Sequence, residues 1–157
     1  MRTTYETFNR HVLCALDGSD NSRRAVGHVA GVLFGCRDFT ITLLHVIAEP
    51  DPDYFGGQPA KRLGWMAEQR KEAQTYLDEY RDFLVETGHP AENVTVLVKE
   101  MDCPSISACI LAERERLGAS ILVLGRQGKN AREELLLGSV SKRVVHHAKD
   151  CAVWVVT

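Results

Sequence analysis

Five short apolar runs, separated by segments with helical periodicity, constrain the fold more than any other feature of this sequence. Each run is rich in Val, Ile and Leu, and most show no alternation of polar and apolar positions. Such continuous runs are typical of strands that are covered on both faces, as in a parallel sheet. The predicted strands cover residues 11–16, 40–46, 94–99, 120–124 and 151–156.

Apolar residues between these runs recur at the spacing of helices. The first helix is expected to begin at Ser19 or Asp20, which are both favourable N-cap residues. The second covers about residues 60–86, and the third begins at Pro104, because proline suits the first helical position. The fourth follows an apolar pattern that starts at Leu137.

This alternation predicts one α/β domain over residues 1–157, a doubly wound parallel sheet of five strands with helices on both faces. A domain of this length buries enough surface to fold without disulfides or a structural metal. One loose stretch, residues 49–59, holds three prolines and two glycines and leaves the carboxyl end of the second strand. It is either a lid over a ligand site or a plain surface connection.

Charge and cysteine spacing exclude several classes of protein. The formal net charge is −2, so no basic excess favours nucleic acid or an anionic membrane. The apolar runs are too short to cross a bilayer, and residues 1–10 have no apolar core, so we expect a cytoplasmic protein. Five cysteines at irregular spacing, with no C-x-x-C pair, argue against a disulfide framework and a zinc site.

The most informative segment follows the fourth predicted strand. It contains Gly125 and Gly128, then nine residues, then Gly138, Ser139 and Val140. Glycine permits positive φ and close approach of a ligand, and the amides at a helix start attract anions. These two turns therefore form a candidate phosphate site, although each is also consistent with an ordinary turn. Neither the P-loop nor the dinucleotide fingerprint occurs.

Two more strand ends reach the same edge of the predicted sheet. Asp17 ends the first strand, and its carboxylate could accept a hydrogen bond from a ribose hydroxyl or a base amine. It could equally stabilise the turn before the first helix. Val46 ends the second strand and offers an apolar face to a flat base, unless it is simply core.

Together these residues resemble the universal stress proteins, in the subgroup that binds ATP. The subgroup pattern G-x-x-G, nine residues, G-[ST] is complete here, and the resemblance extends from about Arg10 to Thr157. It implies the strand order 3-2-1-4-5, ATP as ligand with magnesium as a candidate companion, and a homodimer formed through residues 151–156. The resemblance implies that Asp17 and Val46 bind adenine and ribose, with Ala15 nearby. It implies that the phosphates bind Gly125, Gly128, Gly138, Ser139 and Val140, and that Leu124 and Arg126 flank this phosphate site.

Departures from the family pattern limit this transfer, although none of them removes an expected phosphate contact. Ala15 stands where many relatives have proline, and Cys103-Pro104 replaces a more usual glycine-rich or acidic turn. No nucleophile triad or general base is evident, so we expect a nucleotide-dependent stress or signalling module with slow ATP hydrolysis or none. The alternatives are a genuine ATPase or nucleotidyl-transfer enzyme, and a partner-binding protein that uses AMP or another nucleotide.

Overall fold

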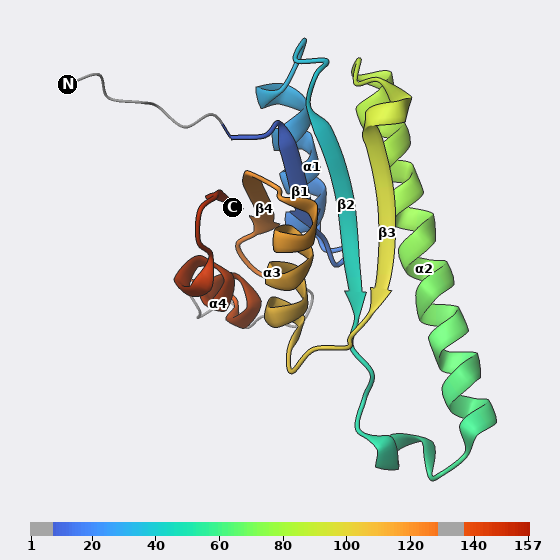
Figure 1. Ribbon diagram of the computed structural model, residues 1–157. Coiled ribbons are helices and arrows are strands. Elements are labelled where there is room, and N and C mark those ends of the chain that lie inside the picture. Colours follow the sequence, from blue (N-terminus) through green and yellow to red (C-terminus); the bar gives the residue numbers. More distant parts are fainter. Residues whose placement is uncertain (1–7, 129–136) are drawn as a thin grey trace.

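The computed structural model describes residues 8–128 and 137–157 and contains one five-stranded sheet (Figure 1). The strands are β1 (His11–Ala15), β2 (Thr40–Ile47), β3 (Val94–Glu100), β4 (Ile121–Gly125) and β5 (Ala152–Val156). The helices are α1 (Asp20–Val32), α2 (Pro59–Glu86), α3 (Ile106–Leu117) and α4 (Ser139–His147), with short 3-10 turns η1 (Pro52–Phe55) and η2 (Ala91–Asn93). The sequence has two basic residues, Lys129 and Arg132, between Gly128 and Gly138, where they are candidates for steering an anionic ligand; both lie outside the described residues.

The strands are parallel and lie in the order β3-β2-β1-β4-β5, which confirms the predicted fold class. In the central strand, Leu13 pairs in register with Thr42 of β2 and Leu122 of β4. The winding direction reverses between β1 and β4, and open α/β sheets bind ligands at the carboxyl edge of such a point.

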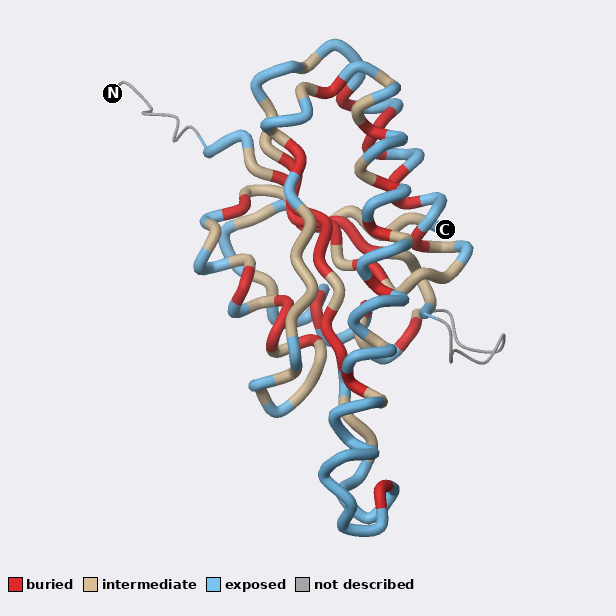
Figure 2. The backbone as a smooth tube through the Cα atoms, turned by 90° about the vertical axis from the view of Figure 1, so that its right-hand side faces the viewer, coloured by how far each residue is buried: buried red, intermediate tan, exposed pale blue. Residues whose placement is uncertain are grey.

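Helices cover both faces of the sheet, with α1 and α2 on one face and α3 and α4 on the other (Figure 1). An apolar core lies on each face of the sheet, and alternate residues of β1 pack into one core or the other. Val12 and Cys14 pack toward α1 and α2, and Leu13 packs toward α3. Figure 2 shows that the buried residues gather along the strands and the helix faces that cover them. Burial on both faces explains why the strand sequences are continuously apolar.

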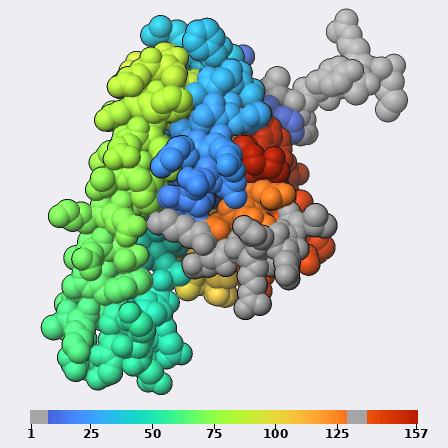
Figure 3. All heavy atoms as spheres, turned by 180° about the vertical axis from the view of Figure 1, so that it is seen from behind, coloured from blue at the N-terminus to red at the C-terminus, as the bar shows by residue number. Residues whose placement is uncertain are grey.

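The connection between β2 and α2 extends the molecule beyond the sheet. Residues 49–59 contain η1 and lead into α2, which has 28 residues and carries Pro59 in its first turn. Figure 3 shows this connection and the start of α2 at one end of the molecule, beyond α1. Phe55 is buried against Trp65, with ring centroids 5.8 Å apart, so this stretch has an apolar contact of its own.

Two helices begin later in the chain than the sequence predicts. Helix α3 begins at Ile106, because Ser105 is its N-cap and accepts a hydrogen bond from the Ala108 amide. Pro104 therefore precedes the helix and is not its first residue. Helix α4 begins at Ser139, so Leu137 lies before it. None of the helices in the described ranges combines the length and hydropathy needed to cross a membrane.

Candidate nucleotide pocket

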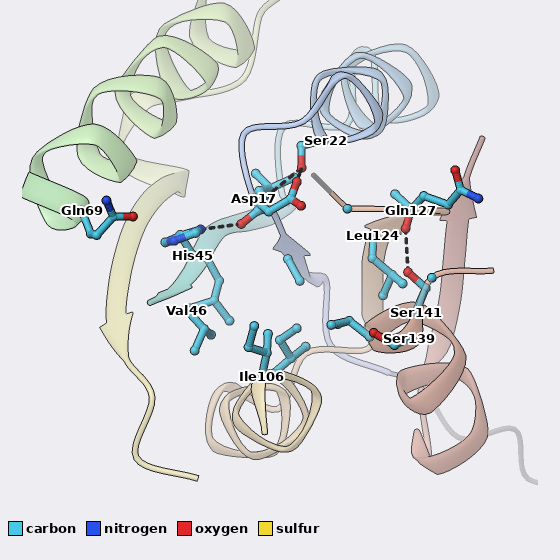
Figure 4. A pocket seen from close by; sticks show the side chains of 18 residues that line it. Asp17, Ser22, His45, Val46, Gln69, Ile106, Leu124, Gln127, Ser139 and Ser141 are labelled. Carbon is cyan, nitrogen blue, oxygen red and sulfur yellow. Dashed lines mark hydrogen bonds between the residues drawn. The ribbon is translucent and has the colours of Figure 1, made fainter. Parts of the chain in front are cut away.

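A pocket of about 700 Å³ lies at the carboxyl edge of the sheet, where β1, β2 and β4 end (Figure 4). Its volume is within the range usual for small-ligand sites. We call it the edge pocket. The residues that line it are Ala15, Leu16, Asp17, Ser22, Leu44, His45, Val46, Gln69, Ile106, Ile110, Leu124, Gly125, Gln127, Gly128, Gly138, Ser139, Val140 and Ser141.

The two glycine turns meet at this pocket. The Gly138 amide donates a hydrogen bond of 2.9 Å to the carbonyl of Arg126. One turn further along α4, the buried Ser141 hydroxyl donates to the carbonyl of Gly125 at 2.7 Å. These two bonds fix the amino end of α4 against the end of β4.

The glycines are required by close packing and not by backbone conformation. None of Gly125, Gly128 and Gly138 has φ in the left-handed region, so positive φ is not the reason for glycine at these positions. A Cβ at Gly125 would lie 2.7 Å from the Cβ of Asn21 on α1. At Gly128 it would lie 2.5 Å from Asp17 Oδ2, and at Gly138 3.3 Å from the Arg126 carbonyl oxygen. At Gly125 a larger residue would meet the main chain of Asn21, whereas at Gly128 the Asp17 side chain would have to turn away and at Gly138 the Arg126 carbonyl would have to yield by a few tenths of an ångström.

The amino end of α4 offers amides to the edge pocket. Its first intrahelical bond runs from the Lys142 amide to the Gly138 carbonyl, so the amides of Ser139, Val140 and Ser141 precede it. The N-cap is Gly138, which contributes no side-chain hydrogen bond. Ser139 is the exposed first residue of the helix and not its cap. Amides in this position carry partial positive charge and favour an anion.

Asp17 stabilises the turn between β1 and α1 and also reaches the pocket. Its Oδ1 accepts hydrogen bonds from the Ser19 amide at 3.0 Å and the Ser22 hydroxyl at 2.8 Å. Ser22 in turn accepts from the Asp17 amide at 2.9 Å. The role as a turn residue, one of the two alternatives for Asp17, is therefore observed. The other oxygen, Oδ2, lies beside Gly128, where a Cβ would be only 2.5 Å from it.

The side of the pocket toward β2 and α3 is largely apolar, and the polar side chains of His45 and Gln69 also line the pocket. Val46, Ile106 and Leu124 point into it (Figure 4). His45 Nδ1 lies 2.9 Å from the Leu16 carbonyl oxygen and 2.6 Å from the hydroxyl of Tyr76. Burial, and then the Asp17 carboxylate, raise the pKa of Tyr76 far above its ordinary value, so this phenol stays protonated.

All of the predicted binding residues except Arg126 line the edge pocket. Arg126 contributes through its main chain: its amide donates to the Val156 carbonyl at 2.7 Å, and its carbonyl accepts from Gly138. Within the described ranges, its Nε is buried without a hydrogen-bond partner.

Sequence reasoning missed several lining residues. Ser141 lies about one helical turn after Gly138 of the family motif, and that spacing could have indicated it. Gln69 lies in the middle of α2, and no local signal in the sequence indicates that it reaches this edge. Figure 4 shows Gln69 on one side of the pocket and Ser139 with Ser141 on the opposite side.

The sheet order and the pocket at its reversal point define a doubly wound α/β protein with a small-ligand site. A family model described as the universal stress protein family matches residues 9–157, so the chain belongs to that family.

Solved structures support the same fold. A universal stress protein, UspA, from Lactobacillus plantarum superposes with a TM-score of 0.80 at 18% identity, covering 97% of this chain and 100% of that one. The universal stress protein from Archaeoglobus fulgidus, solved in complex with dAMP, gives a TM-score of 0.67 at 16% identity, covering 96% and 100%. A universal stress protein in complex with cAMP gives 0.64 at 19% identity, covering 96% and 98%.

Proposed function

We propose that this chain is one nucleotide-binding domain that binds ATP in the edge pocket and acts as a cytoplasmic stress-response or signalling module. The observation that carries the proposal is the hydrogen bond from the Gly138 amide to the Arg126 carbonyl, 2.9 Å long, which joins the two glycine turns of the ATP-binding pattern. Relatives in complex with dAMP and cAMP support an adenine nucleotide as the ligand.

The pocket has a polar half and an apolar half that suit the two ends of a nucleotide. In this proposal the phosphates bind the first amides of α4, and the exposed Ser139 hydroxyl donates to a phosphate oxygen. Adenine lies against Val46 and the apolar side chains of α3, with Ala15 nearby. Asp17 Oδ2 lies between these halves and accepts a hydrogen bond from a ribose hydroxyl.

The same arrangement bears on how a magnesium ion is held and on how fast ATP is hydrolysed. Among the lining residues that the structure describes, Asp17 is the one carboxylate, and its Oδ1 already accepts two hydrogen bonds. A magnesium ion that accompanies ATP is therefore held mainly by phosphate oxygens and water. Asp17 and His45 belong to the sugar and base side, so they do not place a general base beside the terminal phosphate, and we expect hydrolysis to be slow at most.

A charged residue at the start of α4 distinguishes a loss of ligand binding from a loss of folding stability. Ser139→Asp brings a carboxylate to the proposed phosphate position, where it repels an anion. The same carboxylate interacts favourably with the helix dipole, by about 0.3–1 kcal/mol. We therefore expect ATP affinity, measured by calorimetry, to fall by about tenfold or more while the melting temperature of the nucleotide-free protein is unchanged or higher.

Ser139→Asn is the matched control, because it is similar in size but neutral, and its ATP affinity should stay within a few-fold of wild type. Unchanged ATP affinity in Ser139→Asp would contradict the proposal. AMP binding as tight as ATP binding would instead favour the module that uses AMP. Multiple turnovers of ATP with magnesium would favour the enzyme.

A further inference from the structure

A cluster of three metal-ligand side chains lies beside the start of α3, outside the edge pocket. Asp102 and Cys103 are in the connection that follows β3, and Cys109 is in α3. Their ligand atoms all lie within 4.8 Å of one another. None of the three lines the edge pocket, although α3 contributes Ile106 and Ile110 to it. We call this group the thiol–carboxylate cluster.

The distances within the cluster match those between ligands of one tetrahedral metal ion. Asp102 Oδ1 lies 3.2 Å from the Sγ of Cys103 and 3.6 Å from the Sγ of Cys109. Zinc binds sulfur at about 2.3 Å and carboxylate oxygen at about 2.0 Å, so two such ligands at a tetrahedral angle are about 3.5 Å apart. Little rearrangement is needed for the three atoms to share one ion.

The charge and the burial of the cluster are also consistent with a shared metal ion. Two thiolates and a carboxylate carry three negative charges, two of which a divalent cation balances; the Lys99 ammonium beside Asp102 adds positive charge that it shares with Glu113. Lys99 Nζ lies 3.5 Å from Asp102 Oδ2, so it orients the carboxylate through the oxygen that does not face the thiols. Cys109 is fully buried, Cys103 is half-buried and Asp102 is exposed, which leaves one side open to solvent.

We propose that Asp102, Cys103 and Cys109 form a binding site for a thiophilic divalent cation, zinc by preference, with water as the fourth ligand. Soft thiolate ligands select zinc over magnesium or calcium. Three protein ligands and an open position are the arrangement of an accessible zinc site.

The alternative interpretation is that Cys103 and Cys109 form a redox-active thiol pair. A disulfide between Cys103 and Cys109 does not involve a carboxylate, yet Asp102 Oδ1 lies 3.2 Å from one Sγ and 3.6 Å from the other. A metal ion uses all three groups as ligands and deprotonates its thiol ligands outright. The geometry thus favours a metal site over an oxidation switch.

Metal titration of the reduced, nucleotide-free protein tests the proposal. Zinc binding is measured by competition with a chromophoric chelator, and cobalt serves as a spectroscopic probe. We expect one equivalent of zinc and a sulfur-to-cobalt charge-transfer band. Asp102→Asn and Cys103→Ser should each weaken zinc binding at least tenfold, and Cys103→Ser should reduce the band. Both positions are at least partly exposed, so these variants should fold, as thermal melting without metal would verify.

Cys36→Ser and Cys151→Ser are matched controls, since both cysteines are half-buried and lie outside the cluster. Both should bind zinc as wild type does. The proposal is overturned if the reduced wild type binds no zinc, or if Asp102→Asn and Cys103→Ser bind it unchanged. Loss of binding in His146→Gln with retention in Cys103→Ser would assign the metal to the exposed histidines of α4 instead.

Discussion

The role of a single residue in this protein depends more on its surroundings than on its type. Asp17 has an evident sequence position at a strand end, yet one of its oxygens is engaged by Ser19 and Ser22, and only the other faces the pocket. Cys14 shows the opposite case. Burial raises the pKa of its thiol to about 12, so Cys14 behaves as a small apolar residue of the core.

The buried His89 makes folding stability depend on pH. It is 4% exposed, and within the described chain its Nε2 has no hydrogen-bond partner. Burial lowers the pKa of this imidazole below its ordinary 6.5. The unfolded chain therefore binds the proton first as pH falls through 6.5, and the free energy of unfolding decreases from there down to the lowered pKa.

Replacing His89 with Gln should make this decrease less steep between pH 7 and pH 5, as measured by urea unfolding. Part of the slope should remain, because burial also lowers the pKa of His11. Glu113, whose pKa is lowered chiefly by its hydrogen bond with Arg116, acts only at more acid pH. His147→Gln, at an exposed position, is the control and should retain the wild-type slope. Equal slopes in His89→Gln and wild type would contradict the assignment.

At the scale of elements, the contact between β4 and α1 explains why the binding motif begins with glycine. The Asn21 amide group donates to the Gln127 carbonyl at 3.0 Å, joining segments that are 106 residues apart. A side chain at Gly125 would meet the main chain and Cβ of Asn21. The motif therefore serves helix packing as well as the pocket, and a bulky substitution there would confuse a binding defect with a folding defect.

Gly125→Ala should destabilise the nucleotide-free protein by about 1–3 kcal/mol, because the added methyl group forces β4 and α1 apart. The measurement is urea unfolding. Gly27→Ala is the matched control: Gly27 lies in α1 with open space around it, so alanine should stabilise the helix by up to about 1 kcal/mol. A Gly125→Ala variant as stable as wild type would show that β4 and α1 can separate without cost.

At the scale of the whole molecule, the two edges of the sheet differ. The β3 edge includes Lys99 and Glu100, and the arginines of α2 bind its outward carbonyls, as Arg70 does at Val98. The β5 edge, with the sequence AVWVV, has no charged residue. Uncharged edges readily pair with another strand, and we propose that two copies of the chain pair along β5.

Proline at an outward position of β5 tests this pairing. The amide of Ala152 and the carbonyl of Val156 bond toward β4, so by alternation the Val155 amide points away from the sheet. Val155→Pro should shift a dimer to a monomer in sedimentation at micromolar concentration. Val96→Pro is the control on the other edge, where the Val94 and Val98 carbonyls accept from α2 and indicate that Val96 also faces outward. A wild-type monomer, or a Val155→Pro dimer, would contradict pairing through β5.

The amino-acid sequence by itself determined the order of strands and helices, the fold class and the glycine pattern. Apolar periodicity is a local property of the chain, and burial of each strand on both faces leaves a direct trace in its composition. One error concerns the start of α3, where the Ser105 cap outweighed the preference of Pro104 for a first helical position.

Only the tertiary structure decided which distant side chains share a site. Gln69 reaches the pocket because α2 packs along β2 and β3, and the Ser141 hydroxyl reaches Gly125 because α4 returns to the end of β4. Cys109 meets Asp102 because α3 folds back beside the connection that carries it, although the cysteine spacing predicted no metal site. Spacing along the chain indicates a local motif, whereas the meeting of separate segments depends on how strands and helices pack in space.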